Sequence, residues 1–292
     1  MNTLAQQILG GLTTGFIYAL LALGFSLVYQ SMRLINFAQG DLFMAGAFIG
    51  YLLAVKVHLP FLPVLVLTVT LCFFLGLAIE RLTLAPRSRT ASGVNLMIRT
   101  IGVSVFLQGS TLLLFGTEEY RFPDQLSGEP ILFGGLVVSR SLVIVGTASL
   151  ALMLVLWAFL KYTALGTAMR AASQDRTGAE MIGIDVPRTR SLAYALSAAL
   201  AGAGGVLIGP LWYVHQSMGV MIGLKGFTAA VIGGMGSMPG AIVGGLCVGM
   251  IENLSTGYVS STWKDAIVFG ILLIMLSVRP DGIFRMRSAE RA

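Results

Sequence analysis

The chain has 292 residues, of which 56% are hydrophobic and only 11% are charged, and its formal net charge is +6. A soluble domain has about 25% charged residues, so these few charges argue against a protein whose whole surface faces water. A mean hydropathy of +0.85 indicates instead a membrane protein with the lipid bilayer as its solvent. The net positive charge is better explained by the placement of basic residues relative to the membrane than by binding to nucleic acid. No nucleic-acid partner is therefore expected.

Long apolar runs recur along most of the sequence. A helix that crosses a bilayer needs about 20 mostly apolar residues, and the runs do not alternate as the strands of a membrane barrel would. The sequence therefore predicts an all-α, polytopic helical membrane protein with a single domain over 1–292 and about seven full spans. The predicted spans are 5–29, 41–57, 61–82, 94–115, 140–160, 191–213 and 264–280.

The basic residues predict the orientation of the chain, because Lys and Arg favour cytoplasmic loops. They gather at 81–99, 161–190 and 279–291, whereas the loop at 116–130 has four acids and one Arg. We therefore expect this loop and the N-terminus outside, and the C-terminus in the cytoplasm. Beyond the acidic residues, two β-prone runs flank the Gly-Gly pair of "EPILFGGLVVS" and predict a small hairpin.

The segment 223–254 is predicted to form a broken or re-entrant helical pair. It must begin and end outside if 191–213 runs outward and the basic tail is cytoplasmic. Its "VIGGMGSMPGAIVGG" gathers glycine and proline, which interrupt helices, between apolar pieces at 227–235 and 241–251. Each piece is too short for a comfortable crossing. Irregular backbone at membrane depth is tolerated only when it is buried in protein or lines a cavity.

Two groups of residues are candidates for the substrate path. In "NFAQGD", Asn36 and Gln39 could form part of a gate or substrate path. The alternative is that this segment caps a helix, with Asp41 at the helix N-terminus. In the broken pair, the alternative is close helix packing through small residues, and Lys225 is expected at the outer mouth, paired with Glu252. The candidates in this second group are Thr228, Gly233, Gly234, Gly236 and Pro239.

The stretch "AASQDRTGAEMIGID", residues 171–185, is polar within an apolar chain. Ser173 or Asp175 can cap a two-turn helix at its start, and Gly183 can end it in the left-handed conformation. Arg176 and Glu180 are spaced as an i,i+4 pair. Because so short a helix is not stable alone in water, the sequence predicts either a helix that docks on a partner or a plain solvated loop.

These residues resemble the cytoplasmic signature loop of ABC importer permeases. The resemblance is carried by Ala171, Ala172, Gly178 and "IDVP" at 184–187, although Arg170 replaces the Glu of the broad signature. The spacing Ala-x-x-x-Gly-Ile is closer to the branched-chain amino acid permeases. Two further blocks resemble that family in the same order, "GLTTGFIYALLALGFSLVYQSMRLINFAQGDLFMAGAF" and "GLKGFTAAVIGGMGSMPGAIVGGLCVGMIENL".

The resemblance implies a permease subunit that imports branched-chain or related amino acids across a bacterial inner membrane. Cytoplasmic ABC ATPase subunits, a second permease subunit and an extracytoplasmic substrate-binding protein would be its partners, and no cofactor or metal is implied. The small side chain of Ala179 would enter a groove of the ATPase. The implied ATPase-coupling helix comprises Ala171, Ala172, Asp175, Ala179, Glu180, Ile182, Gly183 and Ile184.

Signatures of enzymes are missing from the sequence. It has no G-x-x-x-x-G-K-[ST] loop for ATP, and its two histidines, His58 and His215, form no metalloprotease motif. The alternative function is a self-sufficient secondary transporter or channel for a small polar solute. Intramembrane carboxylates for ion coupling would favour that alternative, whereas Glu80 and Glu252 are predicted near span ends. Arg99, the remaining isolated charge, is expected to snorkel to the membrane interface.

Overall fold

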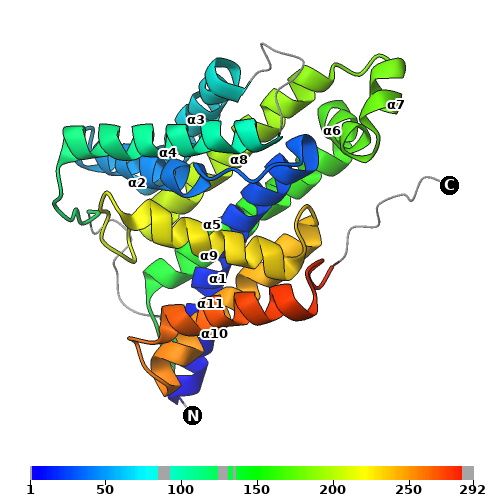
Figure 1. The fold of residues 1–292 in the computed structure, drawn as a ribbon. Helices are drawn as coiled ribbons and strands as arrows, with labels where there is room; N and C mark the ends of the chain where they lie inside the picture. Colours follow the sequence, from blue (N-terminus) through cyan, green and yellow to red (C-terminus); the bar gives the residue numbers. More distant parts are fainter. Residues whose placement is uncertain (1, 85–92, 124–130, 134–135, 285–292) are drawn as a thin grey trace.

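The computed structural model describes residues 2–84, 93–123, 131–133 and 136–284. Most of these residues are helical (Figure 1). The helices are α1 Asn2–Met32, α2 Gln39–Val55, α3 Phe61–Ile79 with its π-helical continuation η1 Glu80–Leu84, α4 Gly93–Phe115, α5 Arg140–Tyr162, α6 Ala164–Gln174, α7 Arg176–Met181, α8 Val186–Ile208, α9 Met218–Gly233, α10 Met238–Tyr258 and α11 Lys264–Val278.

The helical membrane architecture is confirmed. Within the described residues, six helices are long and apolar enough to cross a bilayer: α1, α3 with η1, α4, α5, α8 and α10. The predicted spans at 41–57 and 264–280 are also helices, but α2 and α11 have only 17 and 15 residues. At 1.5 Å per residue they are about 26 and 22 Å long, which is shorter than the roughly 30 Å hydrocarbon core.

The predicted hairpin is confirmed. Strands β1 Ile131–Phe133 and β2 Leu136–Val138 pair antiparallel, with Leu132 opposite Val137. The two glycines of the expected turn lie outside the described residues. A second pairing between distant segments joins Tyr120 and Val214.

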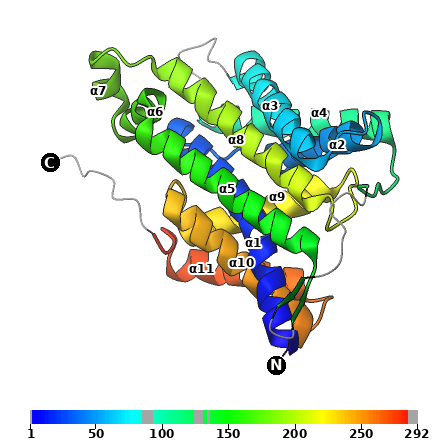
Figure 2. The same cartoon turned by 180° about the vertical axis from the view of Figure 1, so that it is seen from behind.

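Helices α1 and α8 form the centre of the molecule (Figure 2). About 67% of the most apolar part of α1 and 83% of that of α8 is buried, against 22–28% for α3, α4 and α5. The sequence of α8, "LAYALSAALAGAGGVLI" in its apolar part, explains this position, because small side chains let neighbouring backbones approach closely. The outer helices are rich in larger apolar side chains instead.

Glycine contacts hold the central helices together. A Cβ atom on Gly249 of α10 would lie only 2.3 Å from the backbone nitrogen of Gly15 in α1. A Cβ atom on Gly202 of α8 would lie 2.4 Å from the sulfur of Cys72 in α3. No larger residue fits these contacts without a shift of the helices, so the glycines determine how closely the bundle packs.

Several chain segments meet at one end of the molecule. Gln30, near the end of α1, donates a hydrogen bond to the carbonyl of Gly236 between α9 and α10. The segment after α11 joins the same turn, where the Ile283 amide donates to the Ile232 carbonyl at 2.9 Å. The bend between α6 and α7 also lies at this end, and the N-terminus lies at the other (Figure 1). This grouping agrees with the expected topology, while its orientation relative to the membrane stays a prediction.

Candidate functional site

The polar stretch at 171–185 folds into a bend between two helices rather than the single short helix expected. Asp175 separates α6 from α7, because its extended backbone (φ −142°, ψ 107°) ends the first helix, and its carboxylate accepts from the amide of Thr177 to cap the second. The predicted cap at Asp175 is therefore confirmed. Ala171 and Ala172 lie on α6 and are half-buried. We call residues 164–184 the elbow.

The predicted glycine stop of α7 is confirmed. Gly183 has φ +85°, and its amide donates to the carbonyl of Glu180 at 3.1 Å. The amide of Ile184 donates to the carbonyl of Ala179 at 3.0 Å, which completes a Schellman motif. The expected ion pair is also present, with Arg176 Nε 3.2 Å from Glu180 Oε1. Both ends of a six-residue helix are thus satisfied by local hydrogen bonds.

The exposed face of α7 differs from the one expected. Ala179 is only 3% exposed and packs against the chain itself, so it is not available as the contact residue for a partner. Met181 and Ile182 are 82% and 76% exposed instead. The small side chain of Ala179 lets α7 lie close to the rest of the protein, and this packing turns the two larger apolar side chains outward.

A cavity of about 270 Å³ lies behind the elbow. Its walls come from the end of α1, the beginnings of α4 and α8, and the elbow. Arg190 in one wall pairs with Glu80 of η1, at 3.1 Å between Nε and Oε1, and Ser191 also donates to this fully buried carboxylate. The elbow is thus adjacent to charged groups that connect α8 to the end of α3.

Asn36 and Gln39 lie in a buried hydrogen-bond network, and both are at most 1% exposed. The hydroxyl of Ser197 in α8 donates to Gln39 Oε1 at 2.8 Å, and the hydroxyl of Tyr194 contacts Asn36 Oδ1 at 3.3 Å. The amide of Ala38 donates to Asn36 Oδ1 at 3.1 Å. Asn36 thus stabilises the turn before α2, whose N-cap Ala38 has no side-chain capping bond, and the network additionally joins α2 to α8.

Asp41 is turned toward α4. Its Oδ1 accepts from Gln108 Nε2 at 3.0 Å, and its other carboxylate oxygen accepts from the hydroxyl of Ser104. Sequence reasoning missed these partners. The available signal was the i,i+4 spacing of Ser104 and Gln108, which places two polar side chains on one face of an otherwise apolar helix.

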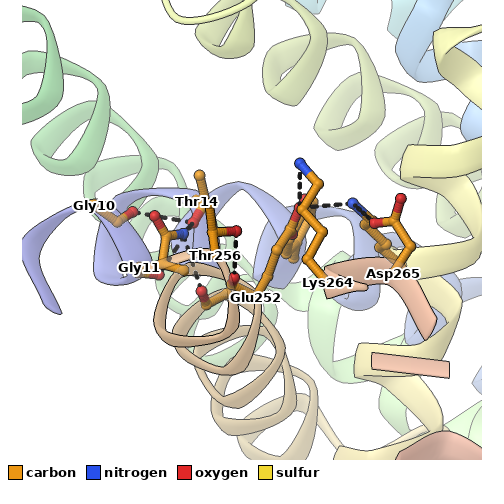
Figure 3. A network of polar contacts seen from close by, with 11 residues as sticks. Gly10, Gly11, Thr14, Glu252, Thr256, Lys264 and Asp265 are labelled. Atoms are coloured by element: carbon orange, nitrogen blue, oxygen red, sulfur yellow. Dashed lines mark hydrogen bonds and ion pairs between the residues drawn. The ribbon is translucent and has the colours of Figure 1, made fainter. Parts of the chain in front are cut away.

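The predicted pair of Lys225 and Glu252 is confirmed, with 2.7 Å between Nζ and Oε1. Both side chains are at most 5% exposed, so the pair is buried within the protein, and its place relative to the outer face stays a prediction. Figure 3 shows how further groups converge on it. Asp265 Oδ1 lies 2.7 Å from Lys225 Nζ, Lys264 Nζ lies 3.6 Å from Glu252 Oε1, and the hydroxyl of Tyr18 donates to Glu252 Oε2 at 2.6 Å. This charge cluster connects α1, α9, α10 and α11.

The predicted helix break is confirmed at 234–237, but the two pieces are longer than the expected 227–235 and 241–251. Helices α9 and α10 have 16 and 21 residues. Ser237 caps α10 by accepting from the amide of Gly240, and Pro239 lies in its first turn. The proline needs no amide donor there, so it begins a helix rather than interrupting one.

The glycines of the break have packing roles. A Cβ atom on Gly233 would lie 2.0 Å from the Gly240 carbonyl, and one on Gly234 would lie 2.4 Å from that of Phe284. Gly234 and Gly236 also have positive φ, at +105° and +84°. Thr228 is fully buried and donates to the carbonyl of Leu224 in its own helix. The packing alternative is thus supported at these positions, and their role in a substrate path stays a prediction.

Taken together, these features define a class of protein. Within the described residues, no group of three or more His, Cys, Asp or Glu side chains could hold a metal ion. The apolar helices, a buried polar interior and a short exposed elbow at one end are typical of a multi-pass transport permease.

The comparisons with known proteins identify the family. Residues 7–276 match the family model described as "Branched-chain amino acid transport system / permease component", and the chain belongs to this family. It is therefore a permease component and a multi-pass protein of the inner membrane. The family resemblance seen in the sequence is confirmed.

Relatives match over nearly the whole chain. The chain is 34% identical to the high-affinity branched-chain amino acid transport system permease protein LivH of Salmonella typhimurium, over 98% of this chain and 97% of the relative. It is 33% identical to BraD of Pseudomonas aeruginosa, with the same coverage. Among solved structures, PsaBC from Streptococcus pneumoniae in complex with Fab has a TM-score of 0.51 at 16% identity, covering 96% of this chain and 93% of that chain. That likeness concerns the fold alone.

Proposed function

We propose that the chain is the membrane-spanning subunit of an ABC importer for a branched-chain or related amino acid. The names of LivH and BraD, which are both high-affinity branched-chain amino acid permeases, support this substrate class. The sequence has no P-loop, so the chain lacks an ATP-binding site of that type. ATP is hydrolysed by separate cytoplasmic ATPase subunits, while a second permease subunit and an extracytoplasmic binding protein complete the importer.

The exposed elbow is the observation that carries this proposal. Helix α7 is preformed by its Asp175 cap and its Gly183 stop, and it displays the apolar side chains of Met181 and Ile182. Fully burying one such side chain contributes about 1.5–3 kcal/mol. A groove of the ATPase gains this contribution without first having to order the helix, because local hydrogen bonds already hold it.

Movement of the elbow reaches the membrane helices through direct contacts. Ala179 packs against the protein behind it, and the cavity behind the elbow includes Arg190, which pairs with Glu80 at the end of α3. Closure of the ATPase subunits therefore shifts α7 against α8 and η1. Helix α8 also contacts the buried polar network that joins it to α2. Asn36 and Gln39 belong to this network and are candidates for a gate.

The charge cluster gives little support to the alternative of an ion-coupled transporter. Glu252 and Asp265 each lie 2.7 Å from Lys225 Nζ. Lys264 supplies a second positive charge, so the two lysines and the two carboxylates of the cluster have no net formal charge. Neither carboxylate of this cluster is left without a cation, as an ion-coupling site would require. Asp41, whose carboxylate accepts from Ser104 and Gln108, lies outside this cluster, so the ATP dependence of uptake is the measurement that separates the two functions.

Reconstitution with the ATPase subunits tests the proposal. In the variant Met181→Glu/Ile182→Glu, a loss of about 1.4 kcal/mol or more in docking would weaken ATPase binding at least about tenfold. ATP-dependent uptake should fall with it, while the protein inserts normally. Leu165→Glu is the matched control, because Leu165 is an exposed apolar residue of the same elbow on α6. Unchanged binding in the double variant, or uptake without ATPase subunits, would contradict the proposal.

A further inference from the structure

A groove runs along the outside of the bundle between α3 with η1 and α4. Its volume is about 640 Å³. Apolar side chains form most of both walls, including Leu75 and Ile79 on one side and Phe106 and Leu107 on the other. Gly102 lies in the α4 wall, and a Cβ atom built there would meet nothing within 4 Å. The groove is therefore open where a larger side chain would have filled it.

Arg99 lies in the lining of the same groove. It is the seventh residue of α4, so it lies about 9 Å along the helix from its start, near the predicted cytoplasmic end. Its side chain is exposed, and among the described residues it forms no ion pair with a carboxylate. A cation beside an apolar surface at this depth is costly unless an anion or water meets it.

The π-helical segment η1 holds this arginine in position. Arg99 Nη1 donates to the carbonyl of Thr83 in η1 at 3.0 Å, which fixes the guanidinium against the α3 side of the groove. A guanidinium has five N–H donors, so most remain for a second partner. Two parallel N–H groups match the oxygens of a phosphate particularly well.

We propose that the groove binds an anionic glycerophospholipid of the bilayer, with its phosphate on Arg99 and one acyl chain along the apolar walls. From Arg99 to Leu107 the α4 wall is about 12 Å long, close to the roughly 15 Å of one leaflet of the hydrocarbon core. Charge complementarity identifies the occupant, because basic pockets between membrane helices bind anionic headgroups. An apolar helix of a second permease would fill the walls but leave Arg99 without a counter-charge.

Native mass spectrometry of the full-length chain in detergent tests this site. With phosphatidylglycerol and phosphatidylethanolamine offered in equal amounts, the unchanged protein should retain phosphatidylglycerol preferentially. One basic residue near a membrane surface contributes about 1 kcal/mol toward an anionic lipid, so Arg99→Gln should reduce that preference about fivefold. Arg99→Lys should keep most of it, because it retains the positive charge.

A bulky side chain introduced into the groove is the second test of the proposed lipid site. Gly102→Phe should reduce retention of both lipids, whereas Gly109→Phe should not, since Gly109 also has open space at its Cβ position but lies outside the groove lining. Should the Gly102 variant fail to fold, the Arg99 series decides alone. Equal retention of both lipids by the unchanged protein, or an unaltered preference in Arg99→Gln, would overturn the proposal. So would crosslinking of Gly102→Cys to a second permease in membranes.

Discussion

Lys225 lies near the middle of α9 with its side chain only 5% exposed. Its ammonium group has two carboxylates at 2.7 Å, from Glu252 and Asp265. Each of these comes from a different helix, so the lysine connects α9 to α10 and to the start of α11. Taking such charges out of water costs several kcal/mol per ion, and the pairing offsets this cost only when the geometry is good. Substitution of one member of the charge cluster should therefore destabilise the protein more than substitution of a matched pair.

Substitution of this lysine tests that reasoning. Lys225→Met should lower the free energy of unfolding by about 3 kcal/mol, because it leaves Glu252 buried with too little positive charge. Lys225→Met/Glu252→Gln should lose less, since the glutamine can still accept from Tyr18. Arg176→Gln is the control, because the pair of Arg176 with Glu180 is more than half exposed and contributes about 1 kcal/mol or less. Unfolding titrations in mild detergent measure all three, and a double variant as unstable as the single one would contradict the expectation.

At the scale of elements, the elbow shows how backbone conformation presents a surface. Helix α7 ends because Gly183 adopts φ +85°, and the Schellman hydrogen bonds then return the chain toward α8. No atom lies within 4 Å of a Cβ built on this glycine. The constraint there is therefore conformational and not one of space. A residue that tolerates the left-handed region should preserve the elbow, and one that does not should distort it.

Two substitutions at Gly183 separate these outcomes. Gly183→Val should disfavour the native backbone by about 1–2 kcal/mol, since a β-branched residue at positive φ is strongly disfavoured. Gly183→Asn should be nearly neutral, because asparagine visits this region readily. Co-purification of the ATPase subunits and ATP-driven uptake should fall for the valine variant and persist for the asparagine variant. Equal behaviour of the two would show that the left-handed stop is not needed for coupling.

At the scale of the whole molecule, the ends of the helices fall into two groups. The elbow, the turn between α9 and α10, and the segment after α11 lie at one end, joined through the contacts of Gln30 and Ile283. Tyr120 and Val214 are paired at the other. The basic residues of 161–190 and Arg279 belong to the first group, which the preference of Lys and Arg for cytoplasmic loops predicts to be cytoplasmic.

Labelling of single cysteines tests this orientation. In a variant without Cys72 and Cys247, Ser261→Cys, in the link between α10 and α11, should react with an impermeant probe added outside. Gln174→Cys, in the elbow, should react only after the membrane is opened. Ser261 and Gln174 are both exposed, so accessibility from one side of the membrane alone should separate them. Labelling of Gln174→Cys from outside would show that the elbow is not cytoplasmic and that the predicted orientation is wrong.

Features that depend on neighbours along the chain could be predicted from the sequence. Hydropathy predicted the membrane helices, and Asp175 and Gly183 predicted a cap and a stop, because both motifs involve residues only a few positions apart. The break near Gly234 followed from local glycine content in the same way. The pairing of Lys225 with Glu252 followed from topology, since the predicted spans place both residues on the same side of the membrane.

The direction in which each helix faces could not be predicted in the same way, because it depends on contacts between distant segments. Ala179 and Ile182 are three residues apart, and their spacing alone does not show that the first is buried and the second exposed. The roles of Tyr18 and Asp265 in the charge cluster, and of Ser104 and Gln108 beside Asp41, likewise depend on the packing of distant helices. In lipid, apolar side chains on both faces of a helix have similar transfer energies. Close packing and polar pairing therefore decide the orientation of each helix.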